Sequence, residues 1–463
     1  MAGEARPPPL GVADLQLLGR RRLLLRLLAR SVRHAVEAYR PAARVARVNI
    51  AHRSFTVPPT VTDELRGWYE AVGLGFGQGR AQDESVARWR EEIARDGWRL
   101  DGAYADAAGF GLGEHTPVAT FATTTQTINT GAGHLEPACF ISDVTVRTTH
   151  RRRGLLTRMM GDALTRARDE GLTLAALTVT EGGIYGRFGF GVATTSVAAE
   201  LDSGPRFQLA RDIEPRVELA TPEASVEARR AVFDAFHAGN RGSHQRLAFY
   251  DAFLSGLWDH EKAAPNRDVR SAVHLDADGK PDGVVSYHFE NDGEKVRVRD
   301  IIATNPEAEL ALWQFLASID LVEKVVLRRL SPTSALPWAL ADPHRLTITK
   351  VADFTWLRAL DVPGAIAARG FESDGEVAFT VDDRLGLASG SYRLVVRDGR
   401  AEVTPVSGAS LRLDVRALGS LHLGLADACV LAGAGQISGP AKDVHALSRL
   451  FRTALPPVNA SGF

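Results

Sequence analysis

Apolar and polar residues follow two different periods along the chain, and each change of period marks an element. In the N-terminal half of the chain, apolar residues at helical spacing predict helices over residues 62–74 and 83–96. Runs rich in β-branched residues predict strands over 47–50, 98–103, 116–126 and 138–146. Helices and strands that interleave in this way are typical of an α/β fold.

The same order of elements recurs after about residue 216. It comprises helices over 227–239 and 247–258, strands over 269–275, 283–291 and 294–302, and a helix over 305–313. The last hundred residues differ and indicate an α+β unit. There we expect a helix over 364–368, strands over 376–382, 390–398, 400–405 and 410–414, and helices over 415–419, 421–424, 430 onward and 441–453. The chain therefore predicts folded units at 45–205, 206–360 and 361–463.

Composition narrows the class of protein. The 463 residues carry a net charge of −1, so no global field favours nucleic acid as a partner. Two cysteines far apart and no secretory segment suggest a reduced cytoplasm. No apolar run reaches the roughly 20 residues of a membrane span, and no Cys/His spacing suggests a metal.

The segment 1–44 is the exception to this composition, because it is rich in proline and then in arginine and leucine. It could form a membrane-surface helix, a nucleic-acid arm, or an extension that is not native to the fold. We favour a dispensable extension, since all the chemistry identified below lies after Val45.

The most informative stretch begins with the strand Asp143–Val146, followed by the basic turn Arg151–Leu156. Apolar residues then recur at helical spacing, at Leu156, Met159, Met160, Ala163, Leu164 and Ala167. A glycine and arginines at a helix N-terminus suit a phosphate group. A basic run of this kind is also common on solvated faces. The motif Tyr185–Phe190, one helix and one strand further on, favours the phosphate interpretation.

The strings HRRRGLL and EGGIYGRFG resemble the Eis (enhanced intracellular survival) branch of the GNAT superfamily of N-acetyltransferases. Leu156 departs from the GNAT phosphate loop, which has a small residue there. The resemblance implies two tandem GNAT-like domains followed by a sterol-carrier-protein-like domain, acetyl-CoA as cosubstrate, no metal, and a homohexamer. The second GNAT-like domain has Ala303–Glu307 in place of the arginine turn, and its glutamate would repel a pyrophosphate. We therefore expect a cofactor loop in the first domain alone.

The resemblance also assigns cofactor contacts. The strand residues Val144, Thr145 and Val146 are expected to pair with pantetheine through their backbone. The pyrophosphate is expected on the loop and first helical turn, formed by Arg151, Arg152, Arg153, Gly154, Leu155, Leu156 and Thr157. Thr180 and Glu181 follow the next strand and would add further contacts.

Acetyl transfer needs an acid for the leaving thiolate and a base for the amine. Tyr185 is the candidate acid, since its reference pKa of about 10 keeps it protonated at neutral pH. Alternatively, Tyr185 is a core aromatic beside Phe188 and Phe190. The resemblance implies that the base is the C-terminal carboxylate, here that of Phe463, with a reference pKa of about 3.5.

The acceptor pocket is expected beside the first two helices, at Trp68, Phe76, Trp89 and Arg90, each of which could equally be core. The resemblance implies aminoglycoside amines and protein lysines as acceptors. Polycations suit acidic pockets, and Gln78 and Gly462 make this one less acidic, although Asp143 and Glu84 could compensate.

The sequence thus predicts an acetyl-CoA-dependent N-acetyltransferase for a small-molecule amine. The alternative is a GNAT scaffold that binds acyl-CoA or lipid without turnover. In the third unit, His422 is expected to be a packed histidine rather than a base.

Overall fold

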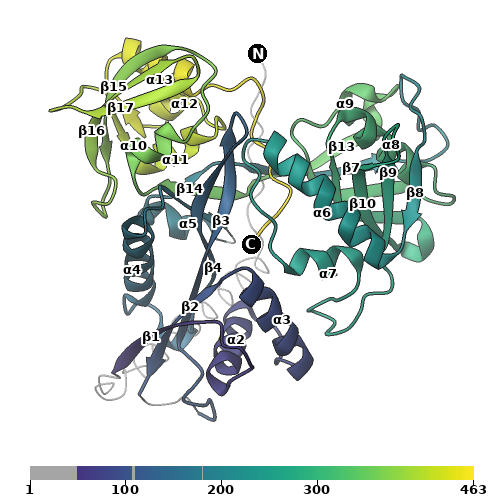
Figure 1. The fold of residues 1–463 in the computed structure, drawn as a ribbon, viewed down its shortest axis with the longest axis horizontal. Coiled ribbons are helices and arrows are strands. Elements are labelled where there is room, and N and C mark those ends of the chain that lie inside the picture. Colours follow the sequence, from purple (N-terminus) through teal and green to yellow (C-terminus); the bar gives the residue numbers. More distant parts are fainter. Residues whose placement is uncertain (1–48, 107–109, 180) are drawn as a thin grey trace, which may run out of the picture. The chain divides into compact units, whose positions relative to one another are not determined.

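The computed structural model describes residues 49–106, 110–179 and 181–463, and these residues form three β-sheets with helices packed on them (Figure 1). The extension expected at residues 1–44 and the candidate residue Thr180 lie outside the described residues.

The first sheet carries the basic turn and the tyrosine motif. Its order is β1 (Ile50–Thr56), β2 (Arg99–Ala105), β3 (Ala119–Gly131), β4 (His134–Val146), β5 (Leu174–Thr178), β14 (Thr355–Ala359) and β6 (Gly191–Val192). Its helices are α2 (Asp63–Phe76), α3 (Asp83–Arg95), α4 (Leu155–Asp169) and α5 (Gly182–Tyr185), with 3₁₀ turns at Thr148–His150 and Gly186–Phe188. Of the strand expected at 47–50, residues 47 and 48 lie outside the described residues, and β1 begins at Ile50.

Strands β3 and β4 are longer than their apolar runs predicted, because a tight turn joins them. Gly131 pairs with His134, and the two residues between them, Ala132 and Gly133, both have positive φ. Two such residues form the turn that matches the right-handed twist of a hairpin. The turn therefore extends the ladder beyond the alternating segment.

The second sheet has the order β13 (Leu346–Asp353), β7 (Thr195–Asp202), β12 (Lys324–Leu330), β11 (Lys295–Ala303), β10 (Pro281–Glu290), β9 (Arg270–Leu275) and β8 (Val217–Ala220). Its helices are α6 (Pro222–Gly239), α7 (Phe249–Ser255), α8 (Pro306–Ala317) and α9 (Leu336–Ala339), with 3₁₀ turns at Asn291–Gly293 and Pro343–Arg345.

The first two sheets exchange a strand. Strand β7 belongs by sequence to the predicted unit 45–205 but pairs in the second sheet, where Ala199 lies opposite Leu327 of β12. Strand β14 belongs to the predicted unit 206–360 but pairs in the first sheet, with Leu357 opposite Ala176 of β5. Neither sheet is complete without a strand from the other stretch of sequence, so the two units are expected to fold together.

The third sheet has the order β17 (Arg400–Pro405), β16 (Gly390–Arg397), β15 (Gly375–Asp382), β18 (Arg412–Asp414) and β19 (Ile437–Ser438). Its helices are α10 (Val362–Ala367), α11 (Val415–His422), α12 (Ala428–Gly433) and α13 (Ala441–Phe451). The two helices expected at 415–419 and 421–424 are one helix, α11. Gly419 does not break it, because its role is close packing: a Cβ there would lie 2.2 Å from the Leu357 carbonyl oxygen.

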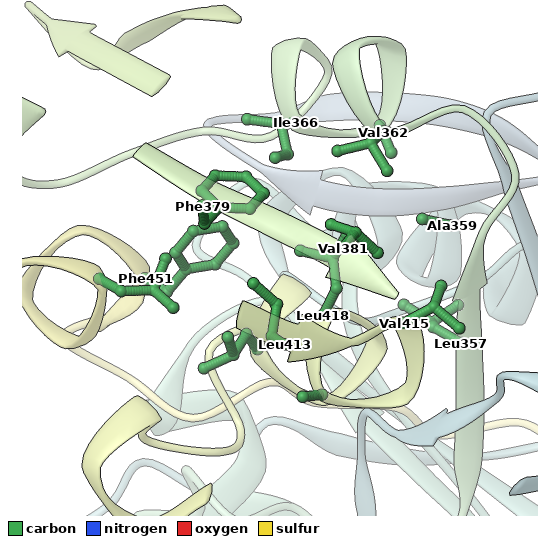
Figure 2. Packing of buried hydrophobic residues seen from close by; sticks show 14 of the residues in the cluster. Leu357, Ala359, Val362, Ile366, Phe379, Val381, Leu413, Val415, Leu418 and Phe451 are labelled. Carbon is green, nitrogen blue, oxygen red and sulfur yellow. The ribbon is translucent and has the colours of Figure 1, made fainter. Parts of the chain in front are cut away.

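One apolar core joins the third sheet to the first (Figure 2). Leu357 and Ala359 of β14 belong to the same buried cluster as Phe379 of β15, Leu418 of α11 and Phe451 of α13. An ion pair is buried beside this core: Arg358 donates to Asp383 over 2.6 Å, and neither side chain is more than 1% exposed. The third unit is therefore fixed to the first sheet by apolar packing and a buried charge pair.

Candidate active site

Strand β4 leaves its neighbour β5 halfway along its length. The parallel pairing runs from Ala138 opposite Leu174 to Ile141 opposite Leu177. Just beyond, Asp143 has a φ of 51° and the pairing of β4 with β3 shifts register. A bulge of this kind bends a strand and ends its pairing. Beyond Ile141, residues 144–146 can therefore offer backbone groups to an extended ligand.

The basic turn presents an uncapped helix N-terminus. Gly154, with a φ of 77°, is the N-cap of the 15-residue helix α4 and supplies no side-chain cap. Arg151, Arg152 and Arg153 precede it and are exposed. The first N–H groups of a helix lack internal partners and carry partial positive charge. The turn therefore has the chemical features that suit an anion, since three guanidinium groups add to the helix dipole.

A cavity of about 450 Å³ joins the bent strand, the turn and the tyrosine motif. Every expected cofactor residue among the described residues lines it: Val144, Thr145, Val146, Arg151, Arg152, Arg153, Gly154, Leu155, Leu156, Thr157 and Glu181. Four residues that sequence reasoning missed line it too: Gly75, His150, Ile184 and Arg187. His150 and Arg187 stand inside the two motifs, where their polar side chains were a usable signal. Gly75 had none, since its role is close packing of α2: a Cβ there would lie 2.4 Å from Thr145 Cβ.

Tyr185 ends α5, is 8% exposed and lines the cavity. Burial raises the pKa of Tyr185 above its ordinary value, and the negative charge of Glu181 raises it further. The phenol therefore stays protonated at neutral pH and can donate a proton. Phe188 and Phe190, at 2% and 0% exposure, are core residues. The motif thus combines core packing with a tyrosine at the cavity.

A buried arginine holds the turn after Tyr185. Arg358 Nη1 donates to the Phe188 carbonyl oxygen while Nη2 donates to Asp383. Asp383 in turn accepts from the backbone N–H groups of Leu385 and Ala388 at 3.1 and 3.0 Å. The third unit therefore contributes to the orientation of the tyrosine motif through this pair.

Phe463 lies beside the C-terminal end of strand β5. An oxygen of its α-carboxyl group accepts from Thr178 Oγ1 at 2.6 Å, and Thr178 is the last residue of β5, three residues before Glu181. Its ring packs edge-on against Phe140 and His244, with centroids 4.5 and 4.9 Å away. Burial lowers the pKa of His244 to about 4. The imidazole that packs against the Phe463 ring is therefore uncharged at pH 7.

Only Phe76 of the four expected acceptor residues lines the cavity. Trp68 is fully buried in a core cluster and donates its indole N–H to the Asp101 carbonyl oxygen at 3.0 Å. Trp89 stacks on Trp68 with centroids 5.8 Å apart. Arg90 pairs with Glu91 at 3.7 Å. Trp68 therefore has the surroundings of a core residue.

The charges expected near the acceptor differ in their surroundings. Asp143 lies on the β4 bulge, and burial raises the pKa of its carboxyl to about 6. Glu84 is exposed and lies 3.6 Å from Arg88, its i+4 neighbour. Gln78 is exposed as well. Asp143 directly precedes the cavity residues Val144–Val146 in the sequence, so it is the acidic candidate adjacent to the cavity strand.

The second sheet has a differently capped helix at the corresponding place. Asn305 caps α8, its side-chain oxygen accepting from the Ala308 N–H at 2.9 Å, and Glu307 stands in the first turn. These features satisfy the helix N-terminus internally and oppose an anion.

Two further side chains, Cys139 and His422, do not line the cavity. Burial raises the pKa of Cys139 to about 12, which makes it a poor nucleophile. His422 is 1% exposed and belongs to α11, so the prediction of a packed histidine is confirmed.

Among the described residues, no group of three or more His, Cys, Asp or Glu side chains could hold a metal ion. Within the same residues, the helices are too short or too polar to cross a bilayer.

Comparison with known proteins places these features in a class. Models described as acetyltransferase (GNAT) domain match residues 57–193 and 255–359, and a sterol carrier protein domain model matches 362–459. The fold matches the crystal structure of Eis1 from Mycobacterium abscessus with a TM-score of 0.73 and 25% identity, covering 90% of this chain and 100% of that one. A GCN5-related N-acetyltransferase from Anabaena variabilis shares the fold, with a TM-score of 0.74 at 19% identity, covering 90% and 100% of the two chains.

The fold and its two GNAT domains define an N-acetyltransferase, an enzyme of the acyltransferase class. The chain is 33% identical over 379 residues to N-acetyltransferase Eis of Mycobacterium tuberculosis, covering 79% of this chain and 89% of that protein. It is also 34% identical over 394 residues to an uncharacterized N-acetyltransferase of Streptomyces avermitilis, covering 82% and 92%. The chain belongs to the Eis family of GNAT N-acetyltransferases.

Proposed function

We propose that this protein transfers an acetyl group from acetyl-CoA to amines of aminoglycoside-like polycations, with protein lysines as a second acceptor class. Tyr185 acts as general acid, and the α-carboxylate of Phe463 acts as base. The observation that carries the proposal is the single cavity that joins the bent strand β4, the uncapped N-terminus of α4 and Tyr185.

The cavity suits acetyl-CoA in both of its parts. Guanidinium groups and helix N–H groups at Arg151–Gly154 fit a pyrophosphate, which is doubly anionic. The free edge of β4 at Val144–Val146 fits the amide groups of pantetheine, as an added strand would. A thioester held by these two contacts would present its carbonyl carbon along the gap between β4 and β5.

The reaction is a direct transfer. The neutral amine forms a C–N bond with the thioester carbon, the C–S bond breaks, and the thiolate leaves. The phenol of Tyr185 donates its proton to the thiolate, and the carboxylate of Phe463 accepts the proton that the amine loses. The place of Tyr185 in the cavity wall, with a phenol that is protonated at neutral pH, supports the first role. The hydrogen bond from Thr178 to Phe463, at the end of the strand that leads to Glu181, supports the second.

Charge favours a cationic acceptor. Asp143 stands on the bulge of β4, and a carboxylate there would attract an amine-rich substrate.

The third unit shares its packed core with β14, and its last residues reach the first sheet at Thr178. Its role in the proposal is therefore structural, because it brings the chain end to the site. A homohexameric assembly remains a prediction from family resemblance, which sedimentation velocity would test.

The decisive experiment extends the chain beyond Phe463. An appended tag converts the carboxylate into a neutral amide, and deletion of Phe463 removes the aromatic anchor between Phe140 and His244. Both changes are expected to lower turnover by about 10²-fold or more, the scale for an acid–base group. The KM for acetyl-CoA should stay within about twofold.

An N-terminal tag is the control and is expected to be harmless, since no described residue of the cavity precedes Gly75. Full activity of a C-terminally tagged enzyme would remove Phe463 from the mechanism and leave Glu181 or a water chain as the route for the proton.

A further inference from the structure

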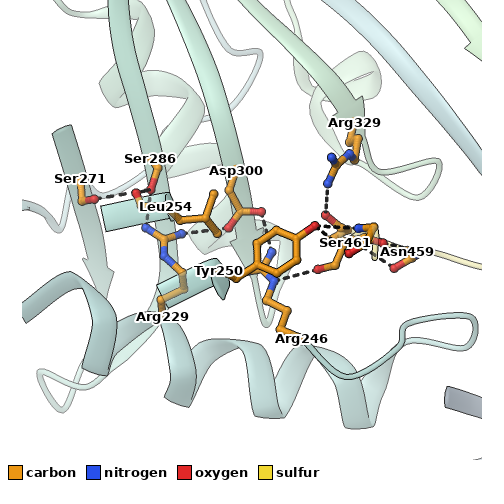
Figure 3. Close-up of polar contacts among 12 residues, drawn as sticks. Arg229, Arg246, Tyr250, Leu254, Ser271, Ser286, Asp300, Arg329, Asn459 and Ser461 are labelled. Atoms are coloured by element: carbon orange, nitrogen blue, oxygen red, sulfur yellow. Dashed lines mark hydrogen bonds and ion pairs between the residues drawn. The ribbon is translucent and has the colours of Figure 1, made fainter. Parts of the chain in front are cut away.

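Side chains from both sheets hold the last five residues of the chain. Asn459 Nδ2 donates to Thr355 Oγ1 and to the Ser461 carbonyl oxygen, each at 2.8 Å. The Ala460 carbonyl oxygen accepts from Arg329 Nη1 at 2.9 Å (Figure 3). Chain ends are ordinarily frayed, and ordering them opposes conformational entropy. Such an ordered end indicates that its geometry matters.

Tyr250 contacts the residue that precedes Phe463. It lies on α7 of the second GNAT domain and is 6% exposed. Its hydroxyl accepts from the Gly462 N–H at 2.7 Å and donates to the Gly462 carbonyl oxygen at 3.1 Å. Gly462 has no side chain, so these backbone groups are its means of attachment. The Gly462 carbonyl belongs to the planar peptide that bears Phe463. By holding both groups, one phenol orients the peptide to which the terminal carboxylate is attached.

A buried charge network fixes Tyr250 in turn. The guanidinium of Arg246 lies over the Tyr250 ring, 5.3 Å from its centroid. Arg246 donates to Ser461 Oγ at 2.8 Å and to Asp300 at 2.6 Å, and Arg229 donates to the other oxygen of Asp300 at 2.9 Å. Burial alone would raise the pKa of Asp300, but Arg246 and Arg229 outweigh it and hold the pKa below its ordinary value. Asp300 is therefore ionised, and Arg246 is held between it and the tail.

We propose that Tyr250 is a positioning residue for the C-terminal carboxylate, so that the second GNAT domain serves catalysis by aiming the base rather than by binding the cofactor. This inference rests on the proposed function, since it needs Phe463 to act as the base. It also gives the second domain a catalytic task, although its own helix α8 is capped by Asn305.

Tyr250→Phe tests the inference, because it removes the hydroxyl and keeps the ring under Arg246. Turnover is expected to fall at least about tenfold, since a shift of about 1 Å in a catalytic group can cost about 100-fold. The KM for acetyl-CoA should stay within about twofold, because the cavity residues are unchanged. Tyr287→Phe is the matched control: Tyr287 is a buried tyrosine on β10 of the second sheet, packed on Phe289 and Phe315, and loss of its hydroxyl should leave turnover within about twofold.

Ser461→Ala provides a second variant if Tyr250→Phe lowers the melting temperature. It removes the acceptor of Arg246 Nε but keeps the ion pair of Arg246 with Asp300, and we expect turnover to fall several-fold with the KM for acetyl-CoA unchanged. Unchanged turnover in both variants would overturn the inference.

A double change separates this inference from the proposed function. In an enzyme extended beyond Phe463 the carboxylate is already lost, so adding Tyr250→Phe should lower turnover no further. Multiplied losses would mean that Tyr250 acts elsewhere and would overturn the inference. If the extension is harmful and Tyr250→Phe is harmless, the inference fails while the proposed base stands. If the extension is harmless, the base assignment fails, and the inference fails with it.

Discussion

At the scale of single residues, the site depends on groups whose surroundings shift their proton affinity. Burial acts on Tyr185 and Asp143 in the same direction, favouring the protonated form of each. The consequences differ because the reference values differ. The phenol stays protonated over the whole physiological range, whereas the carboxyl, with a pKa of about 6, changes charge just below neutral pH.

Tyr185→Phe is expected to lower turnover by about 10²-fold or more, the usual scale for a lost general acid, and to leave the KM for acetyl-CoA within about twofold. The ring remains, so the burial of this side chain persists. Steady-state kinetics with acetyl-CoA and a polyamine would measure both constants. If Tyr185 is only a core aromatic, the variant will turn over at the wild-type rate.

Asp143→Asn is expected to raise the KM for a polycationic amine roughly tenfold at pH 7.5, equivalent to about 1.4 kcal/mol of lost binding. In the wild-type enzyme this KM should rise as pH falls through about 6, because the carboxylate takes up a proton there. The variant should lack this transition.

A monoamine acceptor, compared over the same pH range, corrects for protonation of the amine itself. The control variant is Asp162→Asn, because Asp162 is exposed and lies 3.7 Å from Arg158 on α4.

The same pKa shift predicts an effect on stability. Because the folded pKa of Asp143 lies above its unfolded value, ionisation of Asp143 lowers stability as pH rises through this range. Asp143→Asn should therefore not lower the melting temperature at pH 7.5.

At the scale of elements, the basic turn and helix α4 act as one unit. The loop donates charge and the helix donates N–H groups, and Gly154 with its positive φ joins them. The two motifs predicted this element closely from the sequence, since a helix N-terminus and its glycine are local features. The bulge at Asp143 could not be predicted, because it arises from a register shift against β3.

Arg152→Ala combined with Arg153→Ala is expected to raise the KM for acetyl-CoA about tenfold or more with turnover changed far less, since phosphate contacts bind ground and transition states alike. Arg158→Ala is the control, because Arg158 lies on α4 outside the cavity and 61% of its side chain is exposed. An unaltered KM in the double variant would exclude the turn as the pyrophosphate site.

At the scale of the whole molecule, the three units share strands, core and charges. Strands β7 and β14 cross between the first two sheets, and Arg358 on β14 joins Asp383 of the third unit to the turn after Tyr185. The chain end then returns to β5 through Thr178. We therefore expect stability and the proposed catalysis to depend on the same connections.

Asp383→Ala is expected to lower the free energy of unfolding by about 3–5 kcal/mol, the scale for leaving one charge of a buried pair without its partner. Chemical denaturation would measure it. Asp382→Ala is the matched control one residue away: Asp382 pairs with Arg412 at the surface, where such pairs contribute about 0–1 kcal/mol. Equal losses in the two variants would contradict the assigned role of the buried pair.

The sequence by itself determined most of the order of the elements, the basic turn and the tyrosine motif, because each depends on local spacing and residue type. Its resemblance to a known family implied the succession of two GNAT-like units and a sterol-carrier-like unit. The tertiary structure alone decided which sheet each crossing strand joins, that Trp68 is core, and that His150, Arg187 and Gly75 line the cavity. It also decided that Tyr250, Arg246 and Asp300 hold the chain end. These facts depend on contacts between residues up to more than 200 positions apart, and no local period encodes such a contact.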